Sequence, residues 1–99
     1  MILDWHREAL AEFGEAAHYY DEQVDDLGDR FAGQIEASAA RIRINPLMPR
    51  CFYRECRKVK ADKFPYLVIY RVKNDVVQIL AVMHTSRHPD YWKSRLKNG

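Results

Sequence analysis

Five side chains of the kinds that bind phosphate, stack on rings or transfer protons follow an apolar segment near the C-terminus. They are His84, Arg87, Tyr91, Trp92 and Arg95, called the C-terminal cluster below. In an RNA-cleaving site, His84 would be a general acid or base, Arg87 a phosphate clamp, and Tyr91 a second proton carrier or stacking ring. The structural alternative pairs the arginines with helix carboxylates and places the aromatic rings over the core. Both interpretations stay open on these residues alone.

A second group of cations lies upstream, in and after a predicted strand. Its members are Arg54, Arg57, Lys58, Lys60 and Lys63. Adjacent strands could bring this group near His84 and Arg87, where it would hold an RNA phosphate. The group also makes the chain electrically asymmetric. Residues 1–45 carry 10 acidic and 4 basic side chains, whereas residues 46–99 carry 4 acidic and 12 basic ones. The second half is therefore expected to face an anionic partner, unless it is only a solvated surface.

A metal or cofactor site is not expected. His84 and His88 are four residues apart, but Pro89 favours an extended conformation at His88, so helical spacing does not apply. The chain has no zinc-binding cysteine or histidine motif and no glycine-rich phosphate loop.

The composition predicts one domain spanning residues 1–99 and a cytoplasmic location. Hydrophobic residues make up 47% and charged residues 30% of the chain, enough for a small core. The longest apolar run, Val76–Met83, is too short to cross a membrane. No signal peptide is expected, because acidic and basic residues interrupt the N-terminal segment. Cys51 and Cys56 would lie about 16 Å apart in an extended strand, so both are expected to be reduced.

The N-terminal half predicts a short strand, Ile2–Trp5, followed by a helical hairpin. The first helix has an apolar stripe, and Gly28 is its expected C-cap. The second helix is expected from Asp29 to Ile44, where the Asn45–Pro49 segment ends it. The predicted stripe of the first helix is Leu10, Phe13, Ala17, Tyr20 and Val24, and that of the second is Phe31, Ile35, Ala39 and Ile42.

The C-terminal half predicts three strands: Phe52–Val59, Tyr66–Val72 and Val76–His84. Asn74-Asp75 suits a two-residue hairpin turn that needs positive φ angles. That turn would pair Arg71 with Gln78, Ile69 with Leu80 and Leu67 with Val82, with His84 on the same face. Both faces are largely apolar. One must lie under the helices, and the other suits a partner helix or an added strand.

Segments spread over nearly the whole chain resemble a known superfamily. They are Tyr19-Tyr20, Leu27-Gly28-Asp29-Arg30-Phe31, Arg57, Phe64-Pro65-Tyr66, Ile69-Tyr70-Arg71-Val72 and Ala81-Val82-Met83-His84-x-x-Arg87-x-Pro89-x-Tyr91-Trp92. Their order and spacing look like the RelE/ParE superfamily of type II toxin–antitoxin toxins, closer to its ParE branch. The resemblance implies an α+β fold of order β-α-α-β-β-β, with a short C-terminal tail or helix. It also implies a cognate antitoxin and a toxin–antitoxin hetero-oligomer.

The resemblance implies one of two activities. RelE-like members cut messenger RNA on the ribosome, and Lys58, Lys60 and Tyr91 match their basic and tyrosine positions. ParE-like members poison DNA gyrase without nuclease chemistry. Leu67 and Thr85 stand where RelE-like nucleases carry two arginines, which favours the ParE-like interpretation.

We therefore expect a binding surface for target or antitoxin. It would comprise Arg57, Arg71, His84, Arg87, Tyr91, Trp92 and Arg95. Two alternatives remain at this stage. One is a ribosome-dependent endoribonuclease that uses His84, Arg87 and Tyr91 with the two lysines of the basic strand. The other is a member that only binds its antitoxin and regulates the operon.

Overall fold

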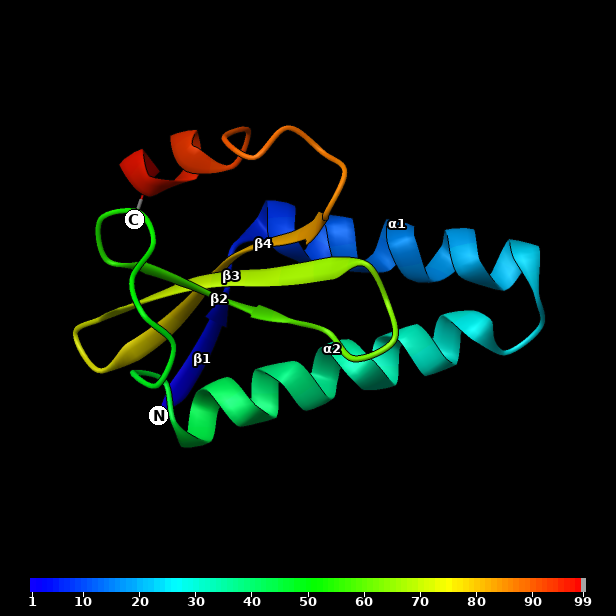
Figure 1. The fold of residues 1–99 in the computed structure, drawn as a ribbon, viewed down its shortest axis with the longest axis horizontal. Helices are drawn as coiled ribbons and strands as arrows, with labels where there is room; N and C mark the ends of the chain where they lie inside the picture. The colour runs from blue at the N-terminus through cyan, green and yellow to red at the C-terminus, as the bar shows by residue number, and fades with distance from the viewer. Residues whose placement is uncertain (99) are drawn as a thin grey trace.

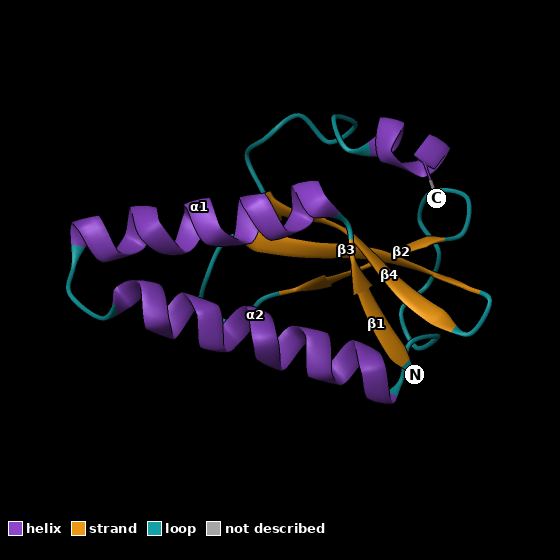
Figure 2. Ribbon diagram, turned by 180° about the vertical axis from the view of Figure 1, so that it is seen from behind, coloured by secondary structure: helices purple, strands orange, loops and turns teal. Residues whose placement is uncertain are grey.

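The computed structural model describes residues 1–98 and contains one four-stranded sheet with two long helices on one face (Figure 1). The expected β-α-α-β-β-β order is confirmed, and a short 3-10 helix follows it. The elements are β1 (Ile2–Trp5), α1 (Arg7–Gln23), α2 (Leu27–Ile44), β2 (Cys56–Lys60), β3 (Tyr66–Lys73), β4 (Val76–His84) and η1 (Lys93–Asn98). Viewed from behind, the helical hairpin covers the sheet on one side and η1 lies on the other (Figure 2). No helix in residues 1–98 combines the length and apolar character that a bilayer span requires.

The sheet has the strand order β1-β4-β3-β2, with β1 parallel to β4 and the other pairs antiparallel. The predicted hairpin turn is confirmed, since Asn74 and Asp75 have φ angles of 52° and 63°. The register beyond the turn was predicted wrongly past Ile79. A bulge at Leu80 pairs Ile69 with Ala81 in place of Leu80. One extra residue shifts every later pair, so the predicted partner of Leu67 is also wrong and is Met83.

The bulge decides which side chains lie on each face of the sheet. Val77, Ile79 and Val82 pack under the helices with Phe31. Leu80, which belongs to the other face, is buried beside Trp92 of the tail. The predicted faces are therefore wrong for the part of β4 that follows the bulge, because a one-residue shift exchanges the two faces. Ala81 and Met83 join the Trp92 side, whereas Val82 joins the helix side.

The second helix follows its predicted stripe, and the first helix departs from its own. Phe31, Ile35, Ala39 and Ile42 are all buried. In α1 the buried positions include Ala9 and Ala16, with Phe13, Ala17 and Tyr20 packed beside them. Leu10 and Val24 are more than half exposed. Val24 lies beyond the last helical residue, and the face that meets the core is rotated away from Leu10.

Gly28 is not the C-cap of the first helix. The helix ends at Gln23, and Gly28 lies in the first turn of α2. Its backbone N–H donates to Asp21 Oδ1 at 2.7 Å. A Cβ atom at this position would lie 2.3 Å from the carbonyl oxygen of Ala17. Glycine is therefore required here because the two helices approach closely.

We expect Gly28→Ala to lower the free energy of unfolding by about 1–3 kcal/mol, because the added methyl group meets backbone. Gly33 is the matched control, since a Cβ there meets no atom within 4 Å. Gly33→Ala should instead raise the free energy of unfolding by roughly 0.5–1 kcal/mol through helix propensity. Urea denaturation of the two variants tests this; equal stabilities would contradict the close approach.

The second strand begins later than predicted, at Cys56 rather than Phe52. The residues before it form a tight turn in which Arg54 has a φ angle of 51°. The N–H of Phe52 donates to the carbonyl of Cys56, and the N–H of Cys56 donates to Tyr53. Cys51 is exposed, Cys56 is buried, and both are free thiols.

Candidate functional site

The C-terminal cluster is organised around one carboxylate, that of Glu12 on α1. Glu12 is 11% exposed. Arg95 donates from Nη1 to Oε1 and from Nη2 to Oε2, both at 2.9 Å. The Tyr91 hydroxyl donates to Oε2 at 2.6 Å, and Arg87 reaches the same oxygen at 3.3 Å. Three members of the cluster thus bind the same carboxylate. The interaction of Arg95 is bidentate, which fixes the orientation of its guanidinium group.

The sheet explains why Glu12 and Arg95 are needed at this place. The pairing of β1 with β4 ends at Trp5 and Ile79, while β4 continues to His84. Past that point β4 is paired only with β3, and its other edge, where β1 has ended, has no strand of the described residues beside it. The carbonyl of Leu80 accepts from Arg95 at 2.8 Å, and the N–H of Val82 donates to Glu12 at 3.0 Å. The two side chains therefore complete the hydrogen bonding of an interrupted strand edge.

The network shifts the pKa of two of its members, Tyr91 and Arg95. Burial and the hydrogen bond to Glu12 raise the pKa of Tyr91 well above its ordinary value. Burial opposes the charge of Arg95, but its hydrogen bonds to Glu12 and the charge of that carboxylate raise the pKa of Arg95. At neutral pH Tyr91 therefore keeps its proton and Arg95 its charge. A tyrosine in this state is a poor general base.

We expect Tyr91→Phe to reduce the loss of stability at alkaline pH. Above about pH 10 the unfolded chain releases the tyrosine proton that the folded chain still holds. The contribution of the raised pKa is complete below that pH and is lost as the pH rises through the folded pKa. Urea denaturation between about pH 8 and 11 measures this slope. The control Tyr19→Phe changes an exposed ring, and its stability should fall with pH as steeply as that of the unaltered protein. Identical slopes for Tyr91→Phe and Tyr19→Phe would contradict the assignment of this effect to Tyr91.

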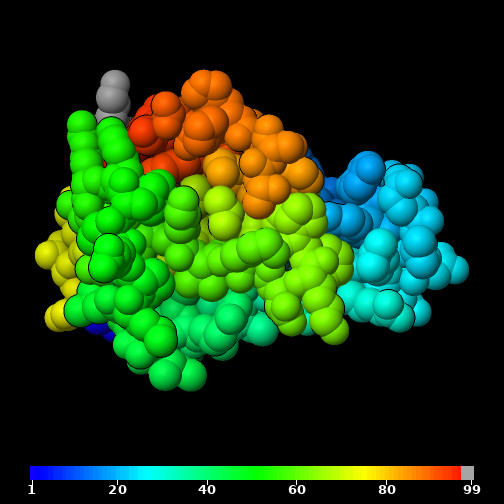
Figure 3. Space-filling model, viewed as in Figure 1, coloured from blue at the N-terminus to red at the C-terminus, as the bar shows by residue number. Residues whose placement is uncertain are grey.

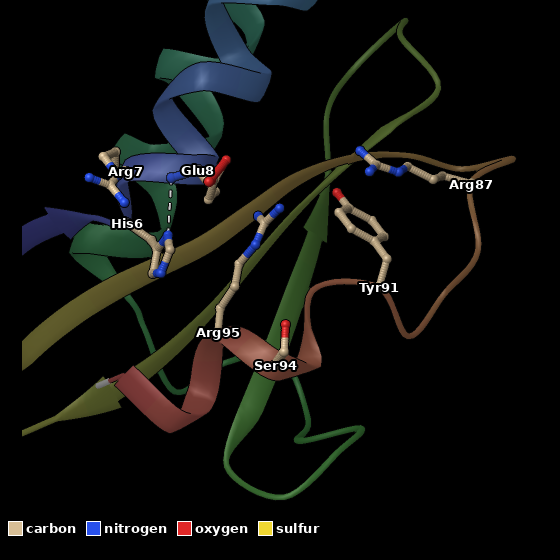
Figure 4. A pocket seen from close by; sticks show the side chains of 7 residues that line it. All are labelled: His6, Arg7, Glu8, Arg87, Tyr91, Ser94 and Arg95. Atoms are coloured by element: carbon tan, nitrogen blue, oxygen red, sulfur yellow. Dashed lines mark hydrogen bonds between the residues drawn. The ribbon is translucent and has the colours of Figure 1, made fainter.

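Beside the network lies a cavity of about 840 Å³, between the start of α1 and the tail (Figure 4). Figure 4 shows His6, Arg7 and Glu8 on one side of it and Arg87, Tyr91, Ser94 and Arg95 on the other. The guanidinium of Arg87 stacks on the Tyr91 ring at 3.6 Å, and its side chain is 54% exposed. The part of the cluster that meets solvent is thus a cation stacked on an aromatic ring.

His84 lies at the other side of Arg87, in a shallow cavity of about 210 Å³ that both residues line. Its Nδ1 accepts a hydrogen bond from the Ser86 N–H at 3.0 Å, and its ring contacts Tyr66 edge-on. A neutral His84 therefore carries its proton on Nε2. The residues that could exchange protons and bind phosphate here are His84 and Arg87.

The basic strand does not join the cluster. The Lys58 ammonium lies over the Phe52 ring at 4.6 Å, and Lys60 donates to the carbonyls of Ala61 and Phe64. Within residues 1–98, no hydrogen bond or ion pair joins either lysine to the C-terminal cluster. Arg57 donates to the carbonyls of Leu47 and Pro49 and so fixes the loop after α2. Among the described residues, the lysines of the basic strand therefore make no direct bond to the cluster, although the Phe52 ring under Lys58 packs against Trp92.

Two members of the expected binding surface lie inside the protein. Trp92 is 0% exposed and packs over the sheet against Phe52 and Tyr53. Arg71 is 4% exposed and binds Gln78 and Glu55. In the part of the chain that is described, Trp92 Nε1 and Arg71 Nη2 have no hydrogen-bond partner. These two side chains support the sheet and are not offered to a partner in this conformation.

Glu12 is the residue that sequence reasoning did not single out. In the structure, a helix carboxylate binds both Arg87 and Arg95. This is the structural alternative that the sequence left open. Glu12 is one of several acidic residues in the first turns of α1, and its spacing alone does not distinguish it from Glu8 or Glu15. Among the described residues, no group of histidine, cysteine and carboxylate side chains is placed to hold a metal ion.

Most of the chain matches known proteins. Residues 3–89 match the family model of the ParE toxin of the type II toxin–antitoxin system parDE. No curated protein matches the chain. A structure of the chromosomal ParDE system from P. aeruginosa is 20% identical, with a TM-score of 0.76 over 87% of this chain and 97% of that one.

Two E. coli structures are also similar. The isolated RelE toxin has 19% identity and a TM-score of 0.65, covering 99% of this chain and 98% of its own. A chain of the intact RelBE toxin–antitoxin complex has 21% identity and a TM-score of 0.66, covering 87% of this chain and 98% of its own. At these identities the structures establish the common fold.

Proposed function

The chain belongs to the family of ParE toxins of type II toxin–antitoxin systems, and on that premise we propose that it inhibits growth by binding DNA gyrase. A cognate antitoxin would neutralise it in a hetero-oligomer, in keeping with the RelBE complex whose toxin has the same fold. The proposed contact surface is the exposed part of the C-terminal cluster, with Arg87 and His84 at its centre.

The observation that supports binding over catalysis is that Glu12 already binds three side chains of the cluster. Its carboxylate accepts from Tyr91, Arg87 and Arg95 together. An RNA phosphate would have to compete with that anion for the same cations. The hydroxyl of Tyr91 is directed at the carboxylate, and its raised pKa keeps it protonated. The cluster thus carries little free catalytic charge, which suits a binding surface.

The sheet supports the same choice. The face that carries Leu67 and Ile69 also carries Trp92, and its side chains form an apolar cluster. A ribonuclease site on this face would need cations near the reacting phosphate. The alternative, a RelE-like endoribonuclease that acts on messenger RNA at the ribosome, is favoured only by the cavity shared by His84 and Arg87.

Two parallel assays separate the activities. Purified protein is added to a gyrase supercoiling and DNA-cleavage assay, and to ribosomes programmed with a messenger RNA. We expect loss of supercoiling with double-strand DNA breaks and an intact message. Cleavage of the message with normal supercoiling would overturn the proposal and support the nuclease.

We expect Arg87→Ala to abolish growth inhibition while leaving the fold intact. Arg87 is half exposed, and its ion pair with Glu12 contributes at most about 1 kcal/mol. Arg43→Ala, an exposed arginine at the end of α2, is the control and should remain inhibitory. Growth after induction and thermal unfolding are measured for both. If Arg87→Ala unfolds at physiological temperature, its role is structural.

A further inference from the structure

A second cavity lies on α2, at a distance from the C-terminal cluster along the fold. It has a volume of about 700 Å³ and is lined by Leu27, Arg30, Gly33, Gln34, Lys63 and Phe64. One side is the exposed surface of α2, and the other is the segment between β2 and β3. In the space-filling view this yellow-green segment rests against the cyan-to-teal helix (Figure 3). We call this cavity the α2 groove.

The wall opposite α2 is held in place by the chain itself. The Lys60 ammonium donates to the carbonyls of Ala61 and Phe64 at 3.0 and 3.1 Å. The N–H of Ala61 donates to Tyr66, and the N–H of Tyr66 donates to Phe64. Within this closed loop Lys63 has a φ angle of 65°, a left-handed conformation that costs a non-glycine residue energy. The loop therefore holds Lys63 beside the groove at some expense of stability.

The other wall contains a glycine that the fold does not need. Gly33 lies in the interior of α2, where glycine costs about 0.5–1 kcal/mol relative to alanine. A Cβ atom at Gly33 would meet nothing within 4 Å, in contrast to Gly28, where the helices require it. Gly33 leaves the groove open to a partner.

The groove has a defined chemical character. Arg30 and Lys63 are among its lining residues, and within residues 1–98 neither side chain makes a hydrogen bond or ion pair. Leu27 and the mostly buried Phe64 supply its apolar lining. Phe64 is itself fixed by the rings of Tyr20 and Phe31. The complementary ligand is a peptide segment that carries carboxylates together with an apolar side chain.

We propose that the α2 groove binds such an acidic segment of the antitoxin, separately from the surface that acts on the target. The proposal rests on the proposed function, because it assumes that the partner is the antitoxin. Charge complementarity selects this partner, since the groove offers two unpaired cations beside apolar surface. DNA and RNA, which present phosphates without apolar side chains, fit the apolar part of the groove less well.

The test uses the product of the reading frame adjacent to the toxin gene as the probe. Gly33→Leu fills the groove, and Gly14→Leu is the matched control, because Gly14 lies in the middle of α1 and also has open space. By calorimetry, Gly33→Leu should weaken binding of that protein by roughly tenfold or more, and Gly14→Leu by less than about twofold. Equal affinities for the two variants would overturn the proposal.

Charge reversal gives an independent measurement. Arg30→Glu and Lys63→Glu should each weaken antitoxin binding by roughly tenfold at low salt, with a smaller effect at high salt. Arg43→Glu makes the same change of charge on α2 outside the groove and should have little effect. If Arg43→Glu weakens binding as much, the attraction is general and the groove is not the site.

Growth assays separate failure of this proposal from failure of the proposed function. Cells that express Gly33→Leu with the antitoxin should stop growing, because the toxin remains active and is no longer neutralised. If Gly33→Leu folds but is no longer toxic by itself, the groove contacts the target, and the proposal is overturned while the toxin function stands. If the unaltered toxin neither inhibits growth nor binds the neighbouring product, both proposals fall.

Discussion

Replacing Glu12 with alanine is expected to lower the free energy of unfolding by about 3–5 kcal/mol, as for removal of one partner from a buried ion pair. Arg95, 11% exposed, would lose both hydrogen bonds to its counter-charge. The N–H of Val82 would lose its acceptor on an edge that no strand covers. Urea denaturation at neutral pH measures the change.

Two controls sharpen this result. Glu15→Ala removes an exposed carboxylate from the same helix and should change stability by less than about 0.5 kcal/mol. Glu12→Gln keeps the shape and one acceptor oxygen but removes the charge, so its cost should lie between the two. If Glu12→Ala costs no more than Glu15→Ala, the tail is not held by this carboxylate.

Phe31→Ala is expected to cost about 3–5 kcal/mol, the usual range for removing a buried aromatic ring. The ring is fully buried on α2 and contacts four others, with centroid distances from 4.9 to 6.1 Å. These rings belong to Phe13, Tyr20, Phe64 and Tyr66. They come from α1, β3 and the segment before β3, so truncation opens a cavity where the helices meet the sheet. A loss of this size is a large share of the stability of a domain this small.

Leu10→Ala is the matched control for Phe31→Ala. The sequence pattern places Leu10 in the buried stripe of the first helix, whereas the structure leaves it about half exposed. Its replacement should therefore change the unfolding free energy by less than about 0.5 kcal/mol. A cost near that of Phe31→Ala would restore the predicted stripe and contradict the orientation of α1.

The features that could be predicted from sequence are those set by local chemistry. The stripe Phe31, Ile35, Ala39 and Ile42 repeats with helical spacing, and it is buried as expected. Asn74-Asp75 tolerates positive φ angles, and the hairpin turn forms there. The bulge at Leu80 has no such signal. Aliphatic residues occupy both faces of β4, so inserting one residue changes the faces without changing the pattern of hydrophobicity.

The candidate site was predictable only in part, for a related reason. The cluster of cations and rings after β4 is visible in the sequence, but the residue that organises it is not. Glu12 meets Arg95 across 83 positions of chain, and nothing local marks it among the acidic residues of α1. Likewise, Trp92 looks like a contact residue until the sheet face beneath it is known.

The pairing of β1 with β4 determines when a newly made chain can fold. β1 pairs with β4, and Glu12 binds Arg95, which lies 83 positions further along the chain. At about 5–20 residues per second, a ribosome must add β4 before the first contact forms and Arg95 before the second. The sheet therefore closes only after β4 has been made, and such distant contacts also form slowly. Each new molecule therefore passes through an interval in which it is not yet folded, and a cognate antitoxin could bind it then.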